Sequence, residues 1–336
     1  MPPFVSIIVP CYNEESTIRH LLDAVLAQTY PRAQMELIIS DGMSTDNTRS
    51  MIEAFQKEHT DLEIRVVDNT VKAIPSALNQ AIRPGRGDVF VRLDAHSMPI
   101  PEYVERCVAA HEAGKGENIG GVWEIRPGAD TLIAKSISFA AAHPLGVGDA
   151  MYRLNAKAGA VDTVPFGSFR RTLIEEIGAF DETLLANEDY EFNTRVRESG
   201  GTVWLDPTIR SVYFSRSTLG RLAAQYWRYG FWKLKMLKRY PHTLRWRQAL
   251  PPLFVLSVIV FIVLSLFFGL ARYALAAQLA IYFFVLGLAG LKLAVEKRNG
   301  FLFFGLPLAI TTMHLSWGAG FLWSFISSPA SARNHG

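Results

Sequence analysis

Short apolar runs alternate with amphipathic stretches in the first part of the chain. Residues 4–10, 36–40, 64–67 and 88–93 are mostly apolar and rich in Val, Ile and Leu, as expected for strands of a buried parallel sheet. Between the first two runs, apolar side chains recur at helical spacing over residues 18–26. Strands that alternate with helices in this way predict a doubly wound α/β sheet, in which ligands bind beyond the carboxyl ends of the strands.

The last quarter of the chain has a different pattern, with apolar stretches long enough for membrane helices. Residues 251–291 contain a single charge, and residues 301–326 contain none. Because about 20 apolar residues of helix cross the hydrocarbon core, we expect spans at about 251–270, 273–291 and 301–326. Transport pathways usually need ionisable or broken-helix sites within the membrane. Few such groups occur here, so the pattern favours an anchor over a transporter.

The charged residues divide the chain into parts. Residues 1–206 have a net charge of −11, residues 207–247 contain ten basic and no acidic side chains, and the remainder has a net charge of +4. A basic band beside apolar segments favours anionic lipid headgroups over nucleic acid. In chain order we expect a globular domain, a basic interfacial amphipathic helix region, a three-helix membrane domain and a tail: residues 1–215, 216–247, 248–326 and 327–336.

The distribution of Lys and Arg also predicts an orientation. Seven basic residues precede the first span closely and three lie in the second loop, whereas the first hairpin and the C-terminus have one each. Since basic loops stay on the cytoplasmic side, we expect a multi-pass protein of the inner (cytoplasmic) membrane with its globular domain in the cytoplasm. The first apolar run has no basic segment before it, so we do not expect a signal peptide.

Polar side chains follow three of the predicted strands at the edge where ligands bind. Asn13 and Glu14 follow the first strand, Asp41 follows the second, and Asp94 and His96 follow the fourth. Each of them alone could be a helix cap or a turn residue. Three polar turns on one sheet edge indicate a binding site instead. No Gly-x-Gly-x-x-Gly follows the first strand, so a dinucleotide site is not expected.

Five motifs occur in an order that resembles a known family: Val5-Ser-Ile-Ile-Val-Pro-Cys-Tyr-Asn-Glu14, Ser40-Asp-Gly-Met-Ser-Thr-Asp-Asn-Thr48, Asp94-Ala-His96, Asn187-Glu-Asp-Tyr-Glu191 and Gln225-Tyr-Trp-Arg-Tyr229. Over residues 4–240 the chain resembles the inverting family 2 glycosyltransferases of the GT-A fold. It is most similar to the membrane-attached branch that builds bacterial exopolysaccharides, such as succinoglycan glucosyltransferases. The resemblance implies a GT-A domain that binds a nucleotide sugar.

The resemblance implies a nucleotide site at the first strands. In this family the turn after the first strand and the aspartate after the second hold the nucleoside, which implies Pro10, Tyr12, Glu14 and Asp41, with Lys72 as a neighbour of the nucleotide. An ionised carboxylate only accepts hydrogen bonds, which suits the imide N–H of uracil. A UDP-sugar is therefore the expected donor.

The resemblance also implies a divalent metal site. The Asp-x-Asp of the family is Asp94-Ala-His96 in this chain, so Asp94 is implied to contact the donor diphosphate and, with His96, to bind Mn²⁺ or Mg²⁺. Such a cation would offset charge on the leaving phosphate. An imidazole binds Mn²⁺ more readily than Mg²⁺. Alternatively, His96 hydrogen-bonds a phosphate, or it simply faces solvent ahead of Pro99.

The acidic pair Glu188-Asp189 carries the implied catalytic role. Inversion needs one base that deprotonates the acceptor hydroxyl during attack, and in this family the aspartate of the pair does so, which implies Asp189 beside Glu188. The alternative is an ordinary acidic first turn of a helix, which the helix dipole favours.

Three further residues are candidates for acceptor binding or gating. Gln225 and Arg228 lie on one helix face and resemble the Gln-x-x-Arg-Trp element of membrane synthases, with Tyr229 in place of Trp. The same segment also fits an interfacial helix. Arg170 could meet a lipid diphosphate, or it could be a solvated residue of a turn.

We therefore expect transfer of one sugar, with inversion, to a polyprenyl-diphosphate-linked saccharide at the membrane. The alternatives are transfer to polyprenyl phosphate itself, a processive polysaccharide synthase, and a non-catalytic membrane protein that binds nucleotide sugars. Too few spans and Tyr229 disfavour the synthase, and the retained acidic residues disfavour the non-catalytic protein. Membrane lipid is an expected partner and nucleic acid is not, while the oligomeric state stays open.

Overall fold

The computed structural model describes residues 2–154 and 156–327, so most of the expected tail lies outside the described residues. Its contacts divide the chain into two units, each described by itself: Met1–Glu124 with Met151–Phe214, and Ile125–Ala150 with Ser215–Gly336. The sequence-based division had placed residues 125–150 in the globular domain. In the structure these residues belong to the unit of the C-terminal helices.

Nine strands of the described residues form one sheet: β1 (Val5–Cys11), β2 (Met35–Asp41), β3 (Glu63–Asp68), β4 (Val89–Arg92), β5 (Ser97–Pro99), β6 (Asn118–Arg126), β7 (Gly159–Ala160), β8 (Ser168–Arg170) and β9 (Val203–Phe214). Their order is β3-β2-β1-β4-β8-β6-β9-β5, with β7 paired to β9. The first four strands are parallel, as the alternation of strands and helices predicted.

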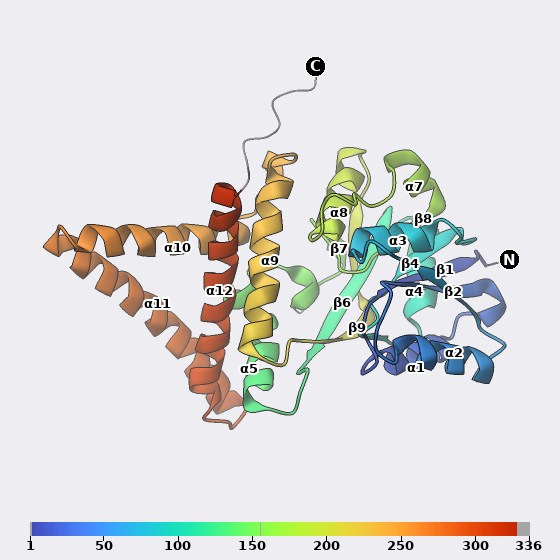
Figure 1. The fold of residues 1–336 in the computed structure, drawn as a ribbon, viewed down its shortest axis with the longest axis horizontal. Helices are drawn as coiled ribbons and strands as arrows, with labels where there is room; N and C mark the ends of the chain where they lie inside the picture. The colour runs from blue at the N-terminus through green and yellow to red at the C-terminus, as the bar shows by residue number, and fades with distance from the viewer. Residues whose placement is uncertain (1, 155, 328–336) are drawn as a thin grey trace, which may run out of the picture. The chain divides into compact units, whose positions relative to one another are not determined.

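Helices cover both faces of the sheet in the first unit (Figure 1). On one face lie α1 (Ile18–Leu26), α2 (Thr48–Glu58) and α4 (Tyr103–Glu112). On the other lie α3 (Ile74–Ile82), α7 (Arg171–Ile177) and α8 (Glu188–Glu198). Successive side chains of a strand point to opposite faces, so Ile7 packs in the first core and Ile8 in the second. Because both faces of β1, β2 and β4 are buried, these strands are mostly apolar rather than alternating, whereas β3 at the end of the sheet is partly exposed.

The second half of the sheet is antiparallel. β8 runs against β4 and pairs Val91 with Ser168 and Val89 with Arg170. The chain therefore enters β8 at the carboxyl end of β4, where the backbone N–H of Arg92 donates to the carbonyl of Gly167 at 3.0 Å. As a consequence, Arg170 lies at the opposite end of β4 from Asp94.

The second unit is helical: α5 (Leu132–Ala141), α6 (Pro144–Val147), α9 (Leu219–Leu237), α10 (Trp246–Ser265), α11 (Gly269–Glu296) and α12 (Leu302–Ser327). The described residues also form short 3₁₀ helices at Arg32–Gln34 and Met151–Arg153 in the first unit and at Pro241–Thr243 in the second. Three helices, α10, α11 and α12, are long and apolar enough to cross a membrane. The first hairpin turns at residues 266–268, earlier than the expected 271–272. There Arg272 lies in the first turn of α11 and its Nε donates to the carbonyl of Ser265 at 2.8 Å.

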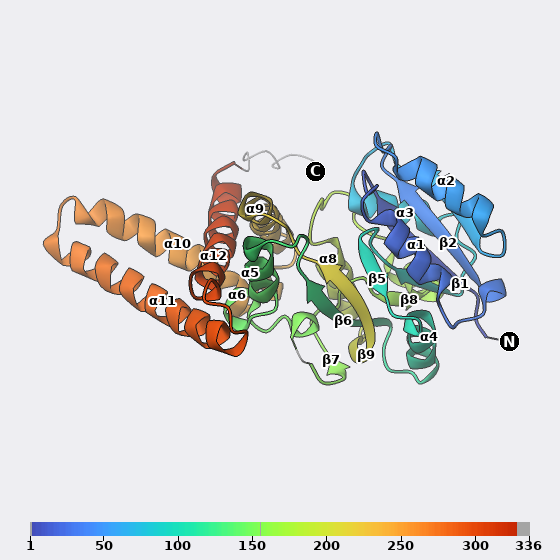
Figure 2. The same cartoon turned by 90° about the horizontal axis from the view of Figure 1, so that it is seen from below.

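Within this unit α12 packs against α9 along its length (Figure 1), and the two helices are also neighbours in the view from below (Figure 2). A Cβ on Gly230 would lie 2.1 Å from the carbonyl oxygen of Trp317, and one on Gly320 would lie 2.3 Å from that of Trp227. Small residues at such contacts let helix backbones approach closely, as is common between apolar helices. One face of α9 therefore packs on α12. The location of α9 at the membrane interface stays a prediction.

We predict that Gly320→Leu destabilises the helical unit. The added side chain would meet the α9 backbone, and overpacking of this kind costs about 1–3 kcal/mol. The thermal melting temperature in detergent measures the loss. Gly220→Leu is the matched control, because a Cβ at Gly220 meets nothing within 4 Å. Equal melting temperatures for the two variants would contradict the close contact.

Candidate active site

The loops that follow β1 and β2 are tied together at the carboxyl edge of the sheet. The side-chain oxygen of Asn13 accepts from the backbone N–H of Thr45 at 2.8 Å, and the N–H of Glu14 donates to Thr48 Oγ1 at 2.8 Å. Tyr12 lies between them with 46% of its surface exposed. These bonds hold an open aromatic ring at the edge where α/β sheets bind ligands.

The backbone at this edge is strained. Six described non-glycine residues have positive φ angles, and five of them lie in the loops here: Asn13, Met43, Lys72, Phe166 and Asn187. Such conformations cost of order 1–3 kcal/mol each and gather at functional sites. The positive φ angles therefore indicate that these loops form a functional site.

Asp41 is fully buried and its carboxylate is already engaged. Oδ2 accepts from the N–H of Ser44 at 3.0 Å and from Arg49 Nε at 2.5 Å, and Oδ1 accepts from Ser44 Oγ at 2.5 Å. Arg49 also pairs with Asp68, whose side chain is 59% exposed. A nucleobase would reach Asp41 only by displacing these partners, so its direct contact stays a prediction.

Asp68 and Arg49 are site residues that the motifs did not include. Asp68 ends β3 directly beside Asp41 in register. Its position directly after the predicted strand 64–67 was the available signal. Arg49 is the second residue of the amphipathic helix α2, where an arginine ordinarily faces water.

The other predicted nucleotide residues gather at the same edge. Lys72 Nζ lies 5.1 Å from the centroid of the Tyr12 ring, within cation–π range. Pro10 pairs with Ser40 near the end of β1. The structure thus brings Pro10, Tyr12 and Lys72 to the ends of the first three strands.

Asp94 and His96 form a tight turn after β4. Ser97 donates to the carbonyl of Asp94 through its N–H at 2.9 Å and its hydroxyl at 2.7 Å. Nδ1 of His96 lies 3.1 Å from Glu14 Oε1, and its ring packs 5.9 Å from that of Tyr213. His96 therefore links this turn to the loop that follows β1.

The residues of this turn suit a divalent cation that takes two ligands from the protein and the others from phosphate and water. Among the described residues no group of three His, Cys, Asp or Glu side chains could hold a metal by itself. Mg²⁺ and Mn²⁺ sites commonly use one or two protein ligands and complete their shell with phosphate and water. The carboxylate of Asp94 and the imidazole of His96 supply such a pair, and the nitrogen ligand favours Mn²⁺.

A buried arginine joins this turn to the acidic pair on α8. Arg92 Nη2 donates to Glu188 Oε1 at 2.9 Å and to Asp94 Oδ1 at 3.3 Å. Arg92 is 4% exposed and Glu188 is 6% exposed. Asp189 is the next residue of α8. The guanidinium of Arg92 therefore lies between Asp94, the predicted contact of the sugar donor, and the segment that carries the predicted base, Asp189.

The surroundings of Asp189 change its acidity. Burial and the charge of Glu188 raise the pKa of Asp189 to about 6, against the lowering effect of Arg92. Its Oδ1 accepts from the backbone N–H of Tyr190 at 2.7 Å. A carboxylate of this kind is a better proton acceptor than an ordinary aspartate and is still ionised at neutral pH, as a general base requires.

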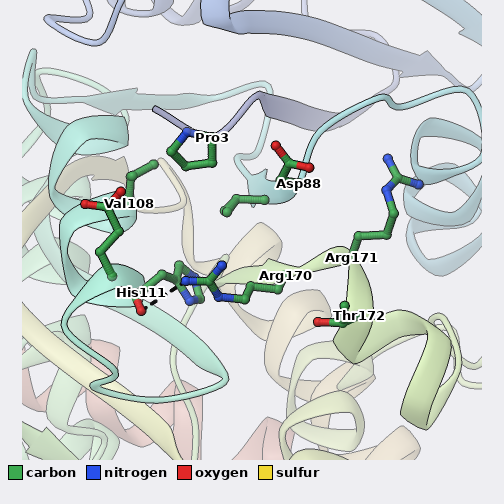
Figure 3. Close-up of a pocket in the computed structure, with 9 residues that line it drawn as sticks. Pro3, Asp88, Val108, His111, Arg170, Arg171 and Thr172 are labelled. Atoms are coloured by element: carbon green, nitrogen blue, oxygen red, sulfur yellow. Dashed lines mark hydrogen bonds between the residues drawn. The ribbon is translucent and has the colours of Figure 1, made fainter. Parts of the chain in front are cut away.

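Arg170 is not brought to this site, because β8 runs antiparallel to β4. It lines a separate pocket of about 460 Å³ near the amino end of β4. The other lining residues are Pro3, Asp88, Val89, Val108, His111, Glu112, Arg171 and Thr172. Figure 3 shows Arg170 beside His111, to whose carbonyl its Nη2 donates at 3.2 Å. The contact of Arg170 with a lipid diphosphate stays a prediction, at a place apart from Asp94 and Asp189.

Gln225 and Arg228 lie on α9 in the second unit. Gln225 Nε2 donates to the hydroxyl of Tyr229 at 2.9 Å, and Arg216 Nε donates to Gln225 Oε1 at 3.3 Å. These bonds order the predicted gating element within its own unit. Its gating role stays a prediction.

Residues 6–178 match the family described as Glycosyl transferase family 2. The dolichyl N-acetyl-alpha-D-glucosaminyl phosphate 3-beta-D-2,3-diacetamido-2,3-dideoxy-beta-D-glucuronosyltransferase of Methanococcus voltae is 27% identical over 330 residues, covering 96% of this chain and 97% of that protein. The succinoglycan biosynthesis protein ExoA of Rhizobium meliloti (strain 1021) is 27% identical over 320 residues, covering 94% and 93%.

Two solved structures share the fold. The mannosyltransferase PcManGT from Pyrobaculum calidifontis, in complex with GDP-Man and Mn²⁺, has a TM-score of 0.64 at 20% identity and covers 96% of this chain and 88% of its own. S. aureus TarS 1–349, in complex with UDP-GlcNAc, has a TM-score of 0.51 at 20% identity and covers 64% and 59%. The predicted GT-A fold is thereby confirmed.

We predict that Asp189→Asn stabilises the protein at neutral pH. A carboxyl whose folded-state pKa is raised contributes stability below its unfolded pKa and loses it as the pH rises through the folded value. The gain in melting temperature should therefore grow between about pH 4 and pH 6 and stay constant above that range. Asp189→Glu, which keeps an ionisable group, is the control. A gain independent of pH would contradict the raised pKa.

Proposed function

This chain belongs to glycosyl transferase family 2, and we propose that it transfers one sugar, with inversion, from a nucleotide sugar to a polyprenyl-diphosphate-linked saccharide. One observation supports this most strongly. Arg92 contacts both Asp94, at the end of β4, and Glu188, beside Asp189 on α8. A leaving diphosphate and an attacking hydroxyl need groups of these two kinds close together.

The donor in this proposal is a UDP-sugar. The exposed ring of Tyr12 offers a surface for stacking, and Lys72 beside it carries a positive charge for the phosphates. A uracil imide N–H needs an acceptor, and Asp68 is the exposed carboxylate next to the buried Asp41. UDP-GlcNAc is the ligand in the TarS complex and GDP-Man in that of the mannosyltransferase.

Asp94 and His96 would hold Mn²⁺ or Mg²⁺ in this proposal. When bound, the cation offsets the negative charge that develops on the leaving diphosphate. The residues of the chain orient this site. Glu14 contacts the imidazole of His96, and Ser97 fixes the turn that carries Asp94. Mn²⁺ accompanies GDP-Man in the structure of the mannosyltransferase.

Asp189 is the proposed general base. It takes the proton of the acceptor hydroxyl while that oxygen attacks the anomeric carbon from the face opposite the leaving group. Glu188 keeps its orientation through Arg92 and supports the raised pKa of Asp189 through its charge. A single base and no protein nucleophile give inversion of configuration.

The acceptor in this proposal is linked to a membrane lipid. Three apolar helices of sufficient length and a helix with several basic residues follow the catalytic part of the chain. An anchor confines the enzyme to the surface that holds such an acceptor, which raises the local concentration of both. The name of the Methanococcus relative includes dolichyl N-acetyl-alpha-D-glucosaminyl phosphate, a sugar linked to a lipid through phosphate. We accordingly place the protein in the inner membrane, with several spans and a cytoplasmic catalytic domain.

We predict that Asp189→Asn abolishes sugar transfer while nucleotide binding survives, because only the proton acceptor is lost. A loss of at least about a hundredfold in kcat is expected for removal of a general base. UDP-sugar hydrolysis without acceptor, measured on wild type and variant, separates an enzyme from a protein that only binds nucleotide sugars. Near-normal transfer by the variant would remove Asp189 from this role.

We predict that transfer stops in excess EDTA and returns on addition of Mn²⁺. His96→Asp should shift the preference from Mn²⁺ toward Mg²⁺, because an all-oxygen site suits Mg²⁺. Transfer rates with each metal, for wild type and variant, are the measurement. Full turnover in excess EDTA would show that transfer does not need the cation proposed at Asp94 and His96.

A further inference from the structure

The candidate site contains a buried charge that none of the five motifs includes. Arg92 is the last residue of β4, is 4% exposed, and lies in a strand that is otherwise apolar. Burying an arginine costs several kcal/mol unless it is paired and hydrogen-bonded. A residue held at that cost at the edge of the site calls for a specific role.

The hydrogen bonds of Arg92 are unevenly distributed. Both bonds, to Glu188 and Asp94, are made by Nη2. Nε and Nη1 are buried and have no hydrogen-bond partner among the described residues. The side chain thus forgoes part of its five-donor capacity while bridging two carboxylates from distant parts of the sequence.

Arg195 shows what a structural arginine looks like in the same unit. Its three nitrogens bond Glu191 and the carbonyls of Ile177, Gly178 and Ala179. It therefore ties α8 to the segment that follows α7 with every nitrogen in use. The contrast separates an arginine that holds a fold from one aimed at two functional carboxylates.

We propose that Arg92 is a positioning residue that holds the donor-binding turn at Asp94 and the base-bearing start of α8 at a fixed separation. This inference rests on the proposed function. Glu188 and Asp94 carry like charges and would repel without the cation between them. Their common partner keeps Asp189, the neighbour of Glu188, aligned with the sugar whose phosphate meets Asp94.

The geometry gives a specific expectation for substitutions. Because one nitrogen makes both bonds, a lysine ammonium can replace it in part, whereas methionine cannot. Arg92→Lys should keep kcat within about tenfold of wild type. Arg92→Met should lower kcat by about a hundredfold or more with little change in the donor KM, since a small misplacement of reacting groups has effects of this size. Arg195→Lys is the matched structural control.

A purely structural role would give a different pattern. Arg92→Met should also move the acidic limb of the kcat profile to higher pH, because Arg92 is a group that lowers the pKa of Asp189. Arg195→Lys should lower the melting temperature and leave that limb in place. If Arg92→Met retains the wild-type limb and a kcat that simply follows its stability, the positioning role is wrong.

Two additions keep the test decisive. Should Arg92→Met fail to fold, Arg92→Met with Glu188→Gln removes the more deeply buried of the two carboxylates that lose their cation. The kcat of this double variant should fall well below that of Glu188→Gln alone, and equal values would overturn the proposal.

A second experiment does not depend on sugar transfer. A double-mutant cycle of Arg92→Lys or Arg92→Met with Asp189→Asn measures the coupling between residues 92 and 189 through melting temperatures. Coupling for Met at pH 7 that disappears at pH 4 supports the proposal even if wild type transfers no sugar, and its absence contradicts it.

Discussion

The arrangement of the candidate site depends on one buried ion-pair cluster. The guanidinium of Arg92 lies between Asp94, after β4, and Glu188, at the start of α8. Both partners are acidic, and without a cation between them they would repel in a region of low dielectric constant. The antiparallel pairing of β8 with β4 supports this arrangement, because it brings Gly167 against the backbone of Arg92. The pairing of β8 with β4 and the ion pairs of Arg92 therefore both fix the end of β4.

Local periodicity was sufficient to predict the parallel half of the fold. β1, β2 and β4 are buried on both faces, so their apolar composition alone identified them, whereas β3 lies at the end of the sheet, is partly exposed and was identified by its short apolar run. The antiparallel half gave no such signal. β8 is three residues long, and its direction, which places Arg170 away from Asp94, follows from pairing with a distant strand. Long-range pairing of that kind leaves no periodic mark in the sequence.

The site was predictable by residue type and much less by environment. The sequence indicated that acidic and aromatic residues gather at the strand ends, as they do. It did not indicate that Asp41 is saturated by Ser44 and Arg49, because the arginine comes from a helix face that would ordinarily be solvated. Arg92 was missed for the opposite reason. A lone charge in an apolar run is easily taken as a strand end, although it is the residue that connects the two acidic motifs.

In the proposed reaction a single base, Asp189, acts without a protein nucleophile. Such a reaction must invert the anomeric centre, because the acceptor attacks opposite the leaving diphosphate. The most direct measurement is the anomeric configuration of the first product formed from an α-configured nucleotide sugar, read by NMR. We expect a β-linked sugar. An α-linked product would contradict it, since retention requires a different arrangement of catalytic groups.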